Sequence, residues 1–390
     1  MFNRKSFLVL VVVIAATVII SNNIVFISKA ELRQEKEKEV AALVSTVSDG
    51  PYIFIEKDAV NNEHLNAFWL CQGKVVKKRL NKTQIPLKTT ACDLPAVVHS
   101  LTHQETAVLT YTGSYDVAAL SDFHGQYDLM IKLLSNNNII DEDNNWAFEN
   151  GHFVITGDIF DRGDKVTEIL WFLYDLERQA EQAGGKIHLT LGNHEVMILN
   201  GDLRYLHPKY LAAAEKLNKS FEQLFSKESI LGNWLRSKPV LVKVNDMLFA
   251  HGGFHPDLAT DYHSLKEINA VFKQNLIKAD LAQPREGFGE YLHRRNGPIW
   301  YRGYFADDEG ATAAEIELLL KHFNVQHLIV GHTSQKQIET RYNGRVIAID
   351  SSIKRGRYGE ILLIEAADDD GKKKMYRGSL TGEKLPLNIN

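Results

Sequence analysis

Residues 189–199, LTLGNHEVMIL, place three consecutive polar side chains between two apolar runs. Gly192 and Asn193 alone would suit a turn, because both residue types tolerate a left-handed backbone. A turn does not require the His194–Glu195 pair that follows. The pattern therefore favours a buried strand that ends in polar side chains belonging to a site. It restricts the fold to one that brings the ends of several strands together.

Five apolar runs along the chain end in the same way, at side chains that can bind metal ions. They are ALSDFHG with Asp122 and His124, VITGDIFDRG with Asp158, Asp161 and Arg162, LTLGNHE with Asn193 and His194, MLFAHGG with His251, and LIVGHTS with His332. In an open α/β sheet, ligands bind at the carboxyl ends of the strands, so these five ends are expected to converge. Each cluster alone would fit a turn, a helix cap or a loop histidine, but together they predict one site.

Strand-like and helix-like patterns alternate through these runs, which predicts an α/β catalytic domain over residues 113–380. Strands are expected at 115–122, 152–158, 186–193, 325–333, 345–350, 359–366 and 373–378, with a hairpin at 239–253 that turns at Asn245-Asp246. Helices are expected at 126–137, 165–185, 209–236 and 312–323. Residues 256–298 are predicted to form a polar, partly helical insertion in this domain.

The first 30 residues form a separate, apolar unit. Arg4 and Lys5 precede an apolar stretch from Phe7 to Ile27, which fits either a cleaved signal peptide, cut after Ala30, or an uncut signal anchor. The anchor is favoured because polar residues lie in the middle of the stretch. Both alternatives predict that the rest of the chain is periplasmic or otherwise extracytoplasmic, held at the inner membrane through residues 7–27 or secreted.

Between this unit and the catalytic domain, we expect a charged helical spacer at 31–50 and a small β-rich module at 51–112. The module holds both cysteines of the chain, Cys71 and Cys92. An even pair in an exported domain favours a disulfide across this 21-residue separation, while two buried free thiols remain the alternative.

The charge of the chain argues against one class of partner. Its 390 residues carry a formal net charge of -4, with no basic tract longer than Lys372-Lys373-Lys374. A nucleic-acid-binding surface requires a concentrated positive charge. We therefore expect no nucleic-acid partner, and the sequence does not indicate the oligomeric state.

The clusters at the strand ends resemble the motif set of the calcineurin-like metallophosphoesterases. The motif segments are 122–125, 157–163, 192–195, 251–253 and 331–332. Asp161-Arg162 and Asn193-His194-Glu195 resemble the phosphoprotein phosphatase branch, and residues 157–208 are similar to the Shewanella-like protein phosphatases. This resemblance covers residues 113–365 and implies a central β-sandwich flanked by helices, with the β-rich module outside it.

The resemblance also implies a ligand set for two divalent metal ions. Asp122, His124 and Asp158 would hold the first ion, and Asp158, Asn193, His251 and His332 the second. Imidazole, carboxylate and amide ligands suit manganese, iron and zinc alike, with manganese expected to support activity in vitro.

The remaining site residues are given roles in catalysis and substrate binding by the same resemblance. A metal-bridging hydroxide would attack the phosphorus while His194 protonates the leaving oxygen and Asp161 orients His194. Arg162 and Arg302, the latter in GPIWYRGY, would hold the phosphate, with Asn193 also facing the substrate.

The predicted enzyme is a metal-dependent phosphatase of phosphate monoesters. Its expected substrate is a phosphoprotein or phosphopeptide, carrying phosphotyrosine, phosphoserine or phosphothreonine. Two alternatives stay open at this point: a dinucleoside polyphosphate hydrolase, and an exported phosphate-binding module without catalysis.

Overall fold

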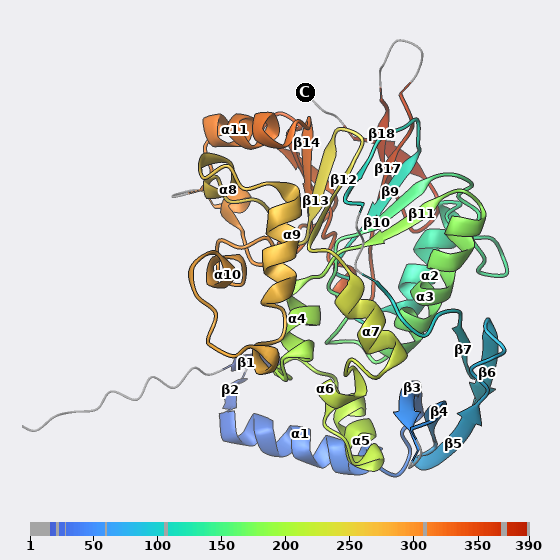
Figure 1. Ribbon diagram of the computed structural model, residues 1–390. Helices are drawn as coiled ribbons and strands as arrows, with labels where there is room; N and C mark the ends of the chain where they lie inside the picture. Colours follow the sequence, from blue (N-terminus) through green and yellow to red (C-terminus); the bar gives the residue numbers. More distant parts are fainter. Residues whose placement is uncertain are drawn as a thin grey trace, which may run out of the picture.

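Two six-stranded sheets form the centre of the computed structural model, which describes residues 16–20, 23–27, 29–58, 61–104, 108–306, 310–367 and 373–387 (Figure 1). The first sheet has the strand order β11-β10-β9-β17-β18-β19, and the second has the order β15-β16-β14-β13-β12-β8. The strands are β8 Thr110–Tyr111, β9 Val117–Leu120, β10 His152–Ile155, β11 Lys186–Leu189, β12 Leu241–Val244, β13 Met247–Ala250, β14 His327–Val330, β15 Glu339–Arg341, β16 Val346–Ala348, β17 Ile361–Ile364, β18 Met375–Gly378 and β19 Lys384–Pro386.

The two sheets pack face to face, and the alternation of side chains along each strand explains why. Val117 and Ala119 of β9 belong to an apolar cluster that they share with Phe249 of β13 in the other sheet. Ala118 and Leu120, on the opposite face of β9, belong to the larger cluster formed with the helices. Because both faces of the sheets are covered at their centre, the strands β9, β13, β16 and β17 are apolar throughout, whereas the edge strands β15 and β19 carry exposed polar residues.

Helices cover the outer faces of this sandwich, with α2 and α3 beside the first sheet and α8, α9 and α11 beside the second (Figure 1). The helices of this region are α2 Tyr127–Asn136, α3 Val166–Gln182, α4 Asn193–Leu199, α5 Pro208–Leu217, α6 Phe221–Leu224, α7 Ile230–Ser237, α8 Asp257–Thr260, α9 Leu265–Gln274, α10 Gly287–Leu292 and α11 Ala313–Phe323. Short 3-10 helices lie at Lys278–Asp280, Gly303–Phe305 and Ile353–Arg355. The predicted α/β class and helix-flanked β-sandwich are confirmed.

The long helical stretch predicted for 209–236 is divided into three helices in the structure. Asn218 ends α5 in a left-handed conformation, with φ of 50°. Ser220 then begins α6 through a capping box with Gln223, and the side chain of Ser229 caps α7 by accepting from Gly232 N. The side chains of Gln223 and Ser229 accept from backbone nitrogens at the starts of α6 and α7, and polar residues that bind the backbone in this way favour helix ends.

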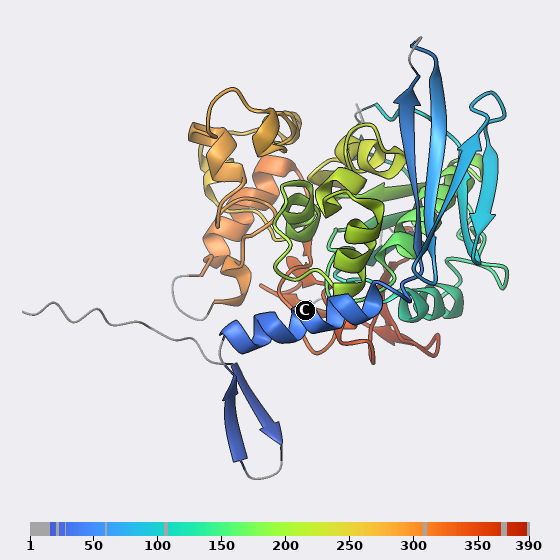
Figure 2. The same ribbon diagram turned by 90° about the horizontal axis from the view of Figure 1, so that it is seen from below.

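The N-terminal module consists of two small antiparallel sheets that lie beside α3, α5 and α7 (Figure 2). Its strands are β3 Asp49–Lys57, β4 Glu63–Cys71, β5 Lys74–Leu80, β6 Leu87–Ala91 and β7 Leu94–Val98. The short strand β8, which the sequence assigned to this module, instead pairs with β12 in the second sheet of the sandwich. The placement of the module boundary at 112 therefore differs from the structure by at least this strand.

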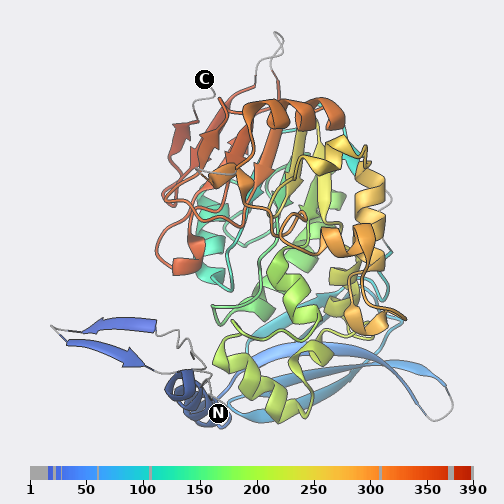
Figure 3. The ribbon, with the colours of Figure 1, turned by 90° about the vertical axis from the view of Figure 1, so that its left-hand side faces the viewer.

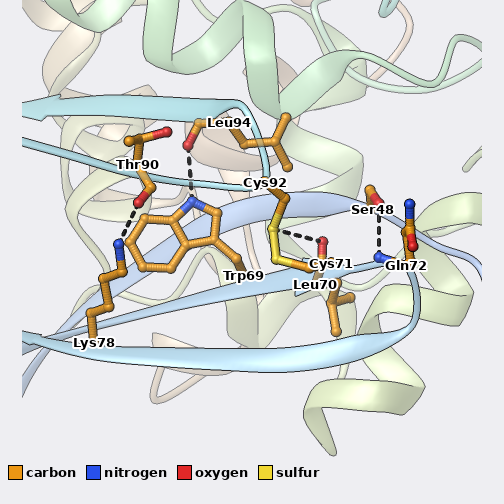
Figure 4. The surroundings of a disulfide bond; sticks show 9 residues. All are labelled: Ser48, Trp69, Leu70, Cys71, Gln72, Lys78, Thr90, Cys92 and Leu94. Atoms are coloured by element: carbon orange, nitrogen blue, oxygen red, sulfur yellow. Dashed lines mark hydrogen bonds between the residues drawn. A yellow bond between two sulfur atoms is a disulfide. The ribbon is translucent and has the colours of Figure 1, made fainter.

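A disulfide links Cys71 at the end of β4 to Cys92 in the turn between β6 and β7, with a Cα–Cα distance of 5.6 Å (Figure 4). It ties the two small sheets together next to Trp69, whose Nε1 donates to Leu94 O at 2.9 Å. In the chain-entropy treatment, closing a loop of this length stabilises the fold by about 3 kcal/mol. The disulfide alternative predicted for these cysteines is the one that the structure shows.

The predicted membrane segment at 7–27 lies partly outside the described residues. Its described portions form two antiparallel strands, β1 Ala16–Ile20 and β2 Asn23–Ile27, which stand away from the body of the molecule (Figure 3). Within the described ranges, no helix combines the length and apolar character that crossing a membrane would require. The Val and Ile side chains in both segments favour an extended backbone, which explains strands at this place.

The predicted spacer contains α1, Lys29–Leu43, which begins two residues earlier than predicted and ends before β3. This helix packs along α5. Its Lys36 Nζ donates to Leu206 O at 3.0 Å. The N-terminal helix therefore contacts the loop that follows α4, close to the strand ends.

Candidate active site

The carboxyl ends of the strands meet at one edge of the sandwich. Strands β9, β10 and β11 are parallel, and Ile155 at the end of β10 pairs with Leu120 at the end of β9 and with Leu189 at the end of β11. Strands β13, β14 and β16 are also parallel, with Ala250 paired to Val330. Because the ends are level, the loops that follow them carry their polar side chains to the same place.

Asp158, which follows β10, lies at the centre of these side chains and is only 2% exposed. Three imidazole nitrogens surround its Oδ2 atom: His251 Nε2 at 3.2 Å, His124 Nε2 at 3.5 Å and His194 Nε2 at 3.7 Å. Its other oxygen, Oδ1, accepts from the backbone nitrogen of His194 at 3.0 Å. One carboxylate oxygen therefore faces imidazole rings from three different strand ends.

The side chains around Asp158 fall into two groups that share this residue. Asp122 Oδ1 lies 3.9 Å from His124 Nε2 on one side. On the other side, His251 Nε2 lies 2.8 Å from Asn193 Oδ1 and 3.0 Å from His332 Nδ1. These are the two predicted ligand sets, and the structure brings all six side chains together.

Several polar atoms in the two groups are buried without a hydrogen-bond partner among the described residues. They include Asp122 Oδ1, His124 Nε2 and His332 Nε2. A buried polar atom without a partner is costly, so such a cluster indicates a missing ion or water. Burial and the nearby Asp350 raise the pKa of Asp122 to about 8, because nothing positive offsets its charge enough. Divalent cations would supply that charge.

The histidines are oriented as metal ligands by backbone carbonyl groups. His124 Nδ1 donates to Phe160 O at 2.7 Å, and His251 Nδ1 donates to Thr156 O at 2.8 Å. These hydrogen bonds leave the lone pair of Nε2 in each ring directed at the centre of the site. Carbonyl partners of this kind fix both the tautomer and the orientation of metal-binding imidazoles.

His194 is held differently, because its Nδ1 atom bonds the buried carboxylate of Asp161. Burial lowers the pKa of His194, but the negative charges of Asp158 and Asp161 outweigh burial and raise it. Cations bound at Asp158 would offset the charge of that carboxylate, but the charge of Asp161 would still raise the pKa of His194. This pairing favours a protonated ring whose Nε2 faces the site, which is the arrangement that a proton donor needs.

Two arginines lie at the mouth of the site, and both remain exposed. Arg302 Nη1 donates to His332 O and to Thr333 Oγ1, both at 3.0 Å. The guanidinium of Arg162 lies 5.3 Å from the ring centre of Tyr205. Each guanidinium keeps donors that a bound phosphate can accept from.

The loops that carry the site adopt strained backbone conformations. Positive φ values occur at Asp122 (55°), His124 (41°), Asp158 (60°), Asp161 (72°), Arg162 (68°) and His332 (64°). A left-handed backbone at residues other than glycine costs about 1–3 kcal/mol each and clusters at functional sites. The sequence contains no pattern that predicts this strain.

Glu195 is a functional residue that the sequence reasoning missed. Its buried carboxylate accepts from the backbone nitrogens of Asp158 at 2.8 Å, Ile159 at 2.7 Å and Gly192 at 2.7 Å. Glu195 therefore fixes the loop that presents Asp158. The spacing was a readable signal, since a Glu three residues after a helix N-cap often binds backbone N–H groups.

The close approach of these loops also explains the glycine in Gly-Asn-His-Glu. A Cβ atom at Gly192 would lie 2.3 Å from Asp158 Oδ1 and 2.6 Å from Asp158 N. No other residue type fits there without displacing the central carboxylate.

Asp350 is a second residue that was missed, although it follows a parallel strand, β16, like the predicted ligands. It is fully buried, accepts from Ser334 Oγ at 2.6 Å and lies 3.3 Å from Lys354 Nζ. Its negative charge raises the pKa of Asp122. Its place at a strand end was the signal for it.

Comparison with known proteins identifies this architecture. Residues 115–336 match the family model described as calcineurin-like phosphoesterase, so the chain belongs to that family and is a phosphatase, as its motifs predicted. It is 39% identical to Shewanella-like protein phosphatase 2 of Arabidopsis thaliana, over 69% of this chain and 79% of that protein. It is 27% identical to Shewanella-like protein phosphatase 1 of Plasmodium berghei, over 69% and 77%.

A solved structure shows the same likeness in three dimensions. The cold-active protein-tyrosine phosphatase of a psychrophilic Shewanella species is 39% identical to this chain and superimposes with a TM-score of 0.79. The match covers 88% of this chain and 100% of that one. The likeness therefore extends beyond residues 115–336 into the N-terminal part of the chain.

The role of Glu195 leads to a prediction for Glu195→Gln. The new amide nitrogen would face backbone N–H groups that now donate to a carboxylate oxygen, so the loop carrying Asp158 would shift. Metal affinity should fall by about 10- to 100-fold, as when other residues that orient metal ligands are replaced. Calorimetric titration of the metal-free protein with Mn²⁺ measures this, and an unchanged affinity would mean that Glu195 does not position the site.

Proposed function

We propose that the chain is a protein phosphatase that uses two divalent cations to hydrolyse phosphate monoesters on protein side chains. The observation that carries the proposal is the position of Asp158 Oδ2, which lies 3.5 Å from His124 Nε2 of one ligand group, 3.2 Å from His251 Nε2 of the other and 3.7 Å from His194 Nε2. A carboxylate with this neighbourhood can bridge two cations while a proton donor stands beside them. The proposal is supported by relatives that are named protein phosphatases.

The ligand groups assign a role to each side chain around Asp158. Asp122 and His124 would share one cation with Asp158. The second cation would be held by Asp158, Asn193, His251 and His332. When bound, the two cations supply charge that stabilises the phosphate oxygens and lowers the pKa of an attacking water. Imidazole, carboxylate and amide ligands suit manganese, iron and zinc, and manganese is our choice for assays.

His194 would give its Nε2 proton to the leaving oxygen as the phosphate ester breaks. Asp161 would hold the ring through Nδ1 and stabilise the charged form before the transfer. Arg162 and Arg302 would orient the phosphate through their planar donors. In this proposal the buried side chains at the strand ends, which form the floor of the site, carry out the chemistry. The two arginines at its mouth position the substrate.

The substrate class can be tested with three compounds in parallel. We expect the purified chain with Mn²⁺ to hydrolyse a phosphotyrosine or a phosphoserine peptide of matched sequence at least about tenfold faster, in kcat/KM, than a dinucleoside tetraphosphate. Asp122→Asn serves as the matched inactive control, because it keeps the shape of the ligand and removes its charge. A faster reaction with the dinucleotide would contradict the protein phosphatase proposal. Wild-type rates no higher than those of Asp122→Asn on all three compounds would support a non-catalytic binding module.

The proton-donor role predicts the effect of His194→Asn. Turnover should fall by about 10²–10⁴-fold, the usual contribution of a positioned general acid, because the leaving oxygen loses its proton source. Bound metal, measured by elemental analysis, should change little. Loss of the metal together with the activity would show that His194 is a ligand instead.

We also propose that the N-terminal segment 7–27 directs the chain out of the cytoplasm. The disulfide supports this, since disulfides persist in oxidising compartments. In a bacterial host, the full chain should fractionate with the inner membrane, or with the periplasm if it is cut after Ala30. Recovery of intact, reduced chain in the cytoplasm would contradict the proposal.

A further inference from the structure

Tyr205 is an aromatic residue exposed at the mouth of the active site. It lies in the loop between α4 and α5, and 46% of it is exposed. Its ring centre is 5.5 Å from the ring centre of His194, with the two planes inclined by 44°. Neither the ligand sets nor the proton-donor pair requires an aromatic side chain here.

The backbone around Tyr205 is fixed from both sides. Arg162 N, in the loop after β10, donates to Tyr205 O at 3.0 Å. Lys36 Nζ of α1 donates to the carbonyl oxygen of the next residue, Leu206, which is buried. The backbone of Tyr205 is therefore hydrogen-bonded to the loop that carries Asp161. This bond fixes the place of the residue beside His194.

Two guanidinium groups hold the ring itself. Arg162 and Arg204 lie 5.3 Å and 5.6 Å from its centre, within the range of cation–π attraction. Arg204 is in turn fixed by Asp202, which accepts from Nε and Nη2, each at 2.8 Å. An exposed aromatic ring that is held in place in this way loses little entropy when a ligand packs against it.

Because Tyr205 lies beside His194, the reaction geometry determines which part of a substrate its ring would contact. In the proposed reaction His194 protonates the leaving oxygen, so the group attached to that oxygen must pass next to His194. In phosphotyrosine that group is an aromatic ring, whereas in phosphoserine it is a single methylene followed by the backbone. Only the former can make a stacked or edge-to-face contact with Tyr205.

We propose that Tyr205 is a specificity-determining residue that packs against the aromatic leaving group and favours phosphotyrosine over phosphoserine. This inference rests on the proposed function, because it assumes that His194 marks the position of the leaving oxygen. It places substrate selection in the loop 200–207, outside the metal site. An aromatic contact of this kind changes kcat/KM by about 3- to 10-fold.

The test compares each variant with the wild-type chain on an aryl and an alkyl ester, phenyl phosphate and glycerol phosphate, and on matched phosphotyrosine and phosphoserine peptides. Taking the ratio of variant to wild type for each substrate cancels the different reactivity of the leaving groups. The variants are Tyr205→Ala, the conservative Tyr205→Phe, and Tyr262→Ala as a control at a tyrosine that is 83% exposed in the turn after α8.

Tyr205→Ala should lower kcat/KM by about 3- to 10-fold for the aromatic esters, mainly through KM, and by less than about 2-fold for the alkyl esters. Tyr205→Phe should restore most of the aromatic preference, and Tyr262→Ala should leave all four rates unchanged. Equal losses on both ester types, or no loss, would overturn the inference. If the wild-type chain cleaves phenyl phosphate but neither peptide, the proposed function fails alone, and the small esters still decide the role of Tyr205.

Discussion

The buried carboxylate of Asp158 is the constraint on which the rest of the site depends. An ionised carboxylate removed from water costs several kcal/mol unless charges and hydrogen bonds replace its hydration. The backbone nitrogen of His194 provides one such bond, and imidazole nitrogens of His251 and His124 lie 3.2 Å and 3.5 Å from Oδ2. Glu195 and Gly192 make this geometry possible by fixing the loop and allowing its close approach.

The floor and the mouth of the site come from different parts of the chain and have different roles. The floor is suited to metal ions, and the mouth faces the substrate. Strand ends form the floor, whose residue types follow from metal chemistry. The mouth depends on loops, and the N-terminal part of the chain reaches it: Lys36 contacts Leu206, and Lys209 lies 3.4 Å from Asp49 of the module while its Nζ donates to Asp164 O. The module therefore supports the loops around the site, although it contributes no ligand.

The sequence predicted the floor of the site well because each ligand follows an apolar strand, and strand ends converge in any α/β sheet of this kind. It assigned no role to Glu195 or Asp350, because neither acid belongs to the metal-ligand pattern. The place of each was nevertheless a readable signal, since Glu195 follows a helix N-cap by three residues and Asp350 follows a parallel strand. The left-handed loops and the position of Tyr205 depend on contacts between distant segments. The helical stretch predicted at 209–236 is helical in the structure, but local polar caps divide it into three helices.

The central claim is that Asp158 bridges two cations, and anomalous X-ray scattering from crystals grown with Mn²⁺ tests it most directly. The account predicts two anomalous peaks on opposite sides of Asp158 Oδ2, one beside Asp122 and His124 and the other beside His251 and His332. A single peak, or a second peak liganded by His194, would contradict it.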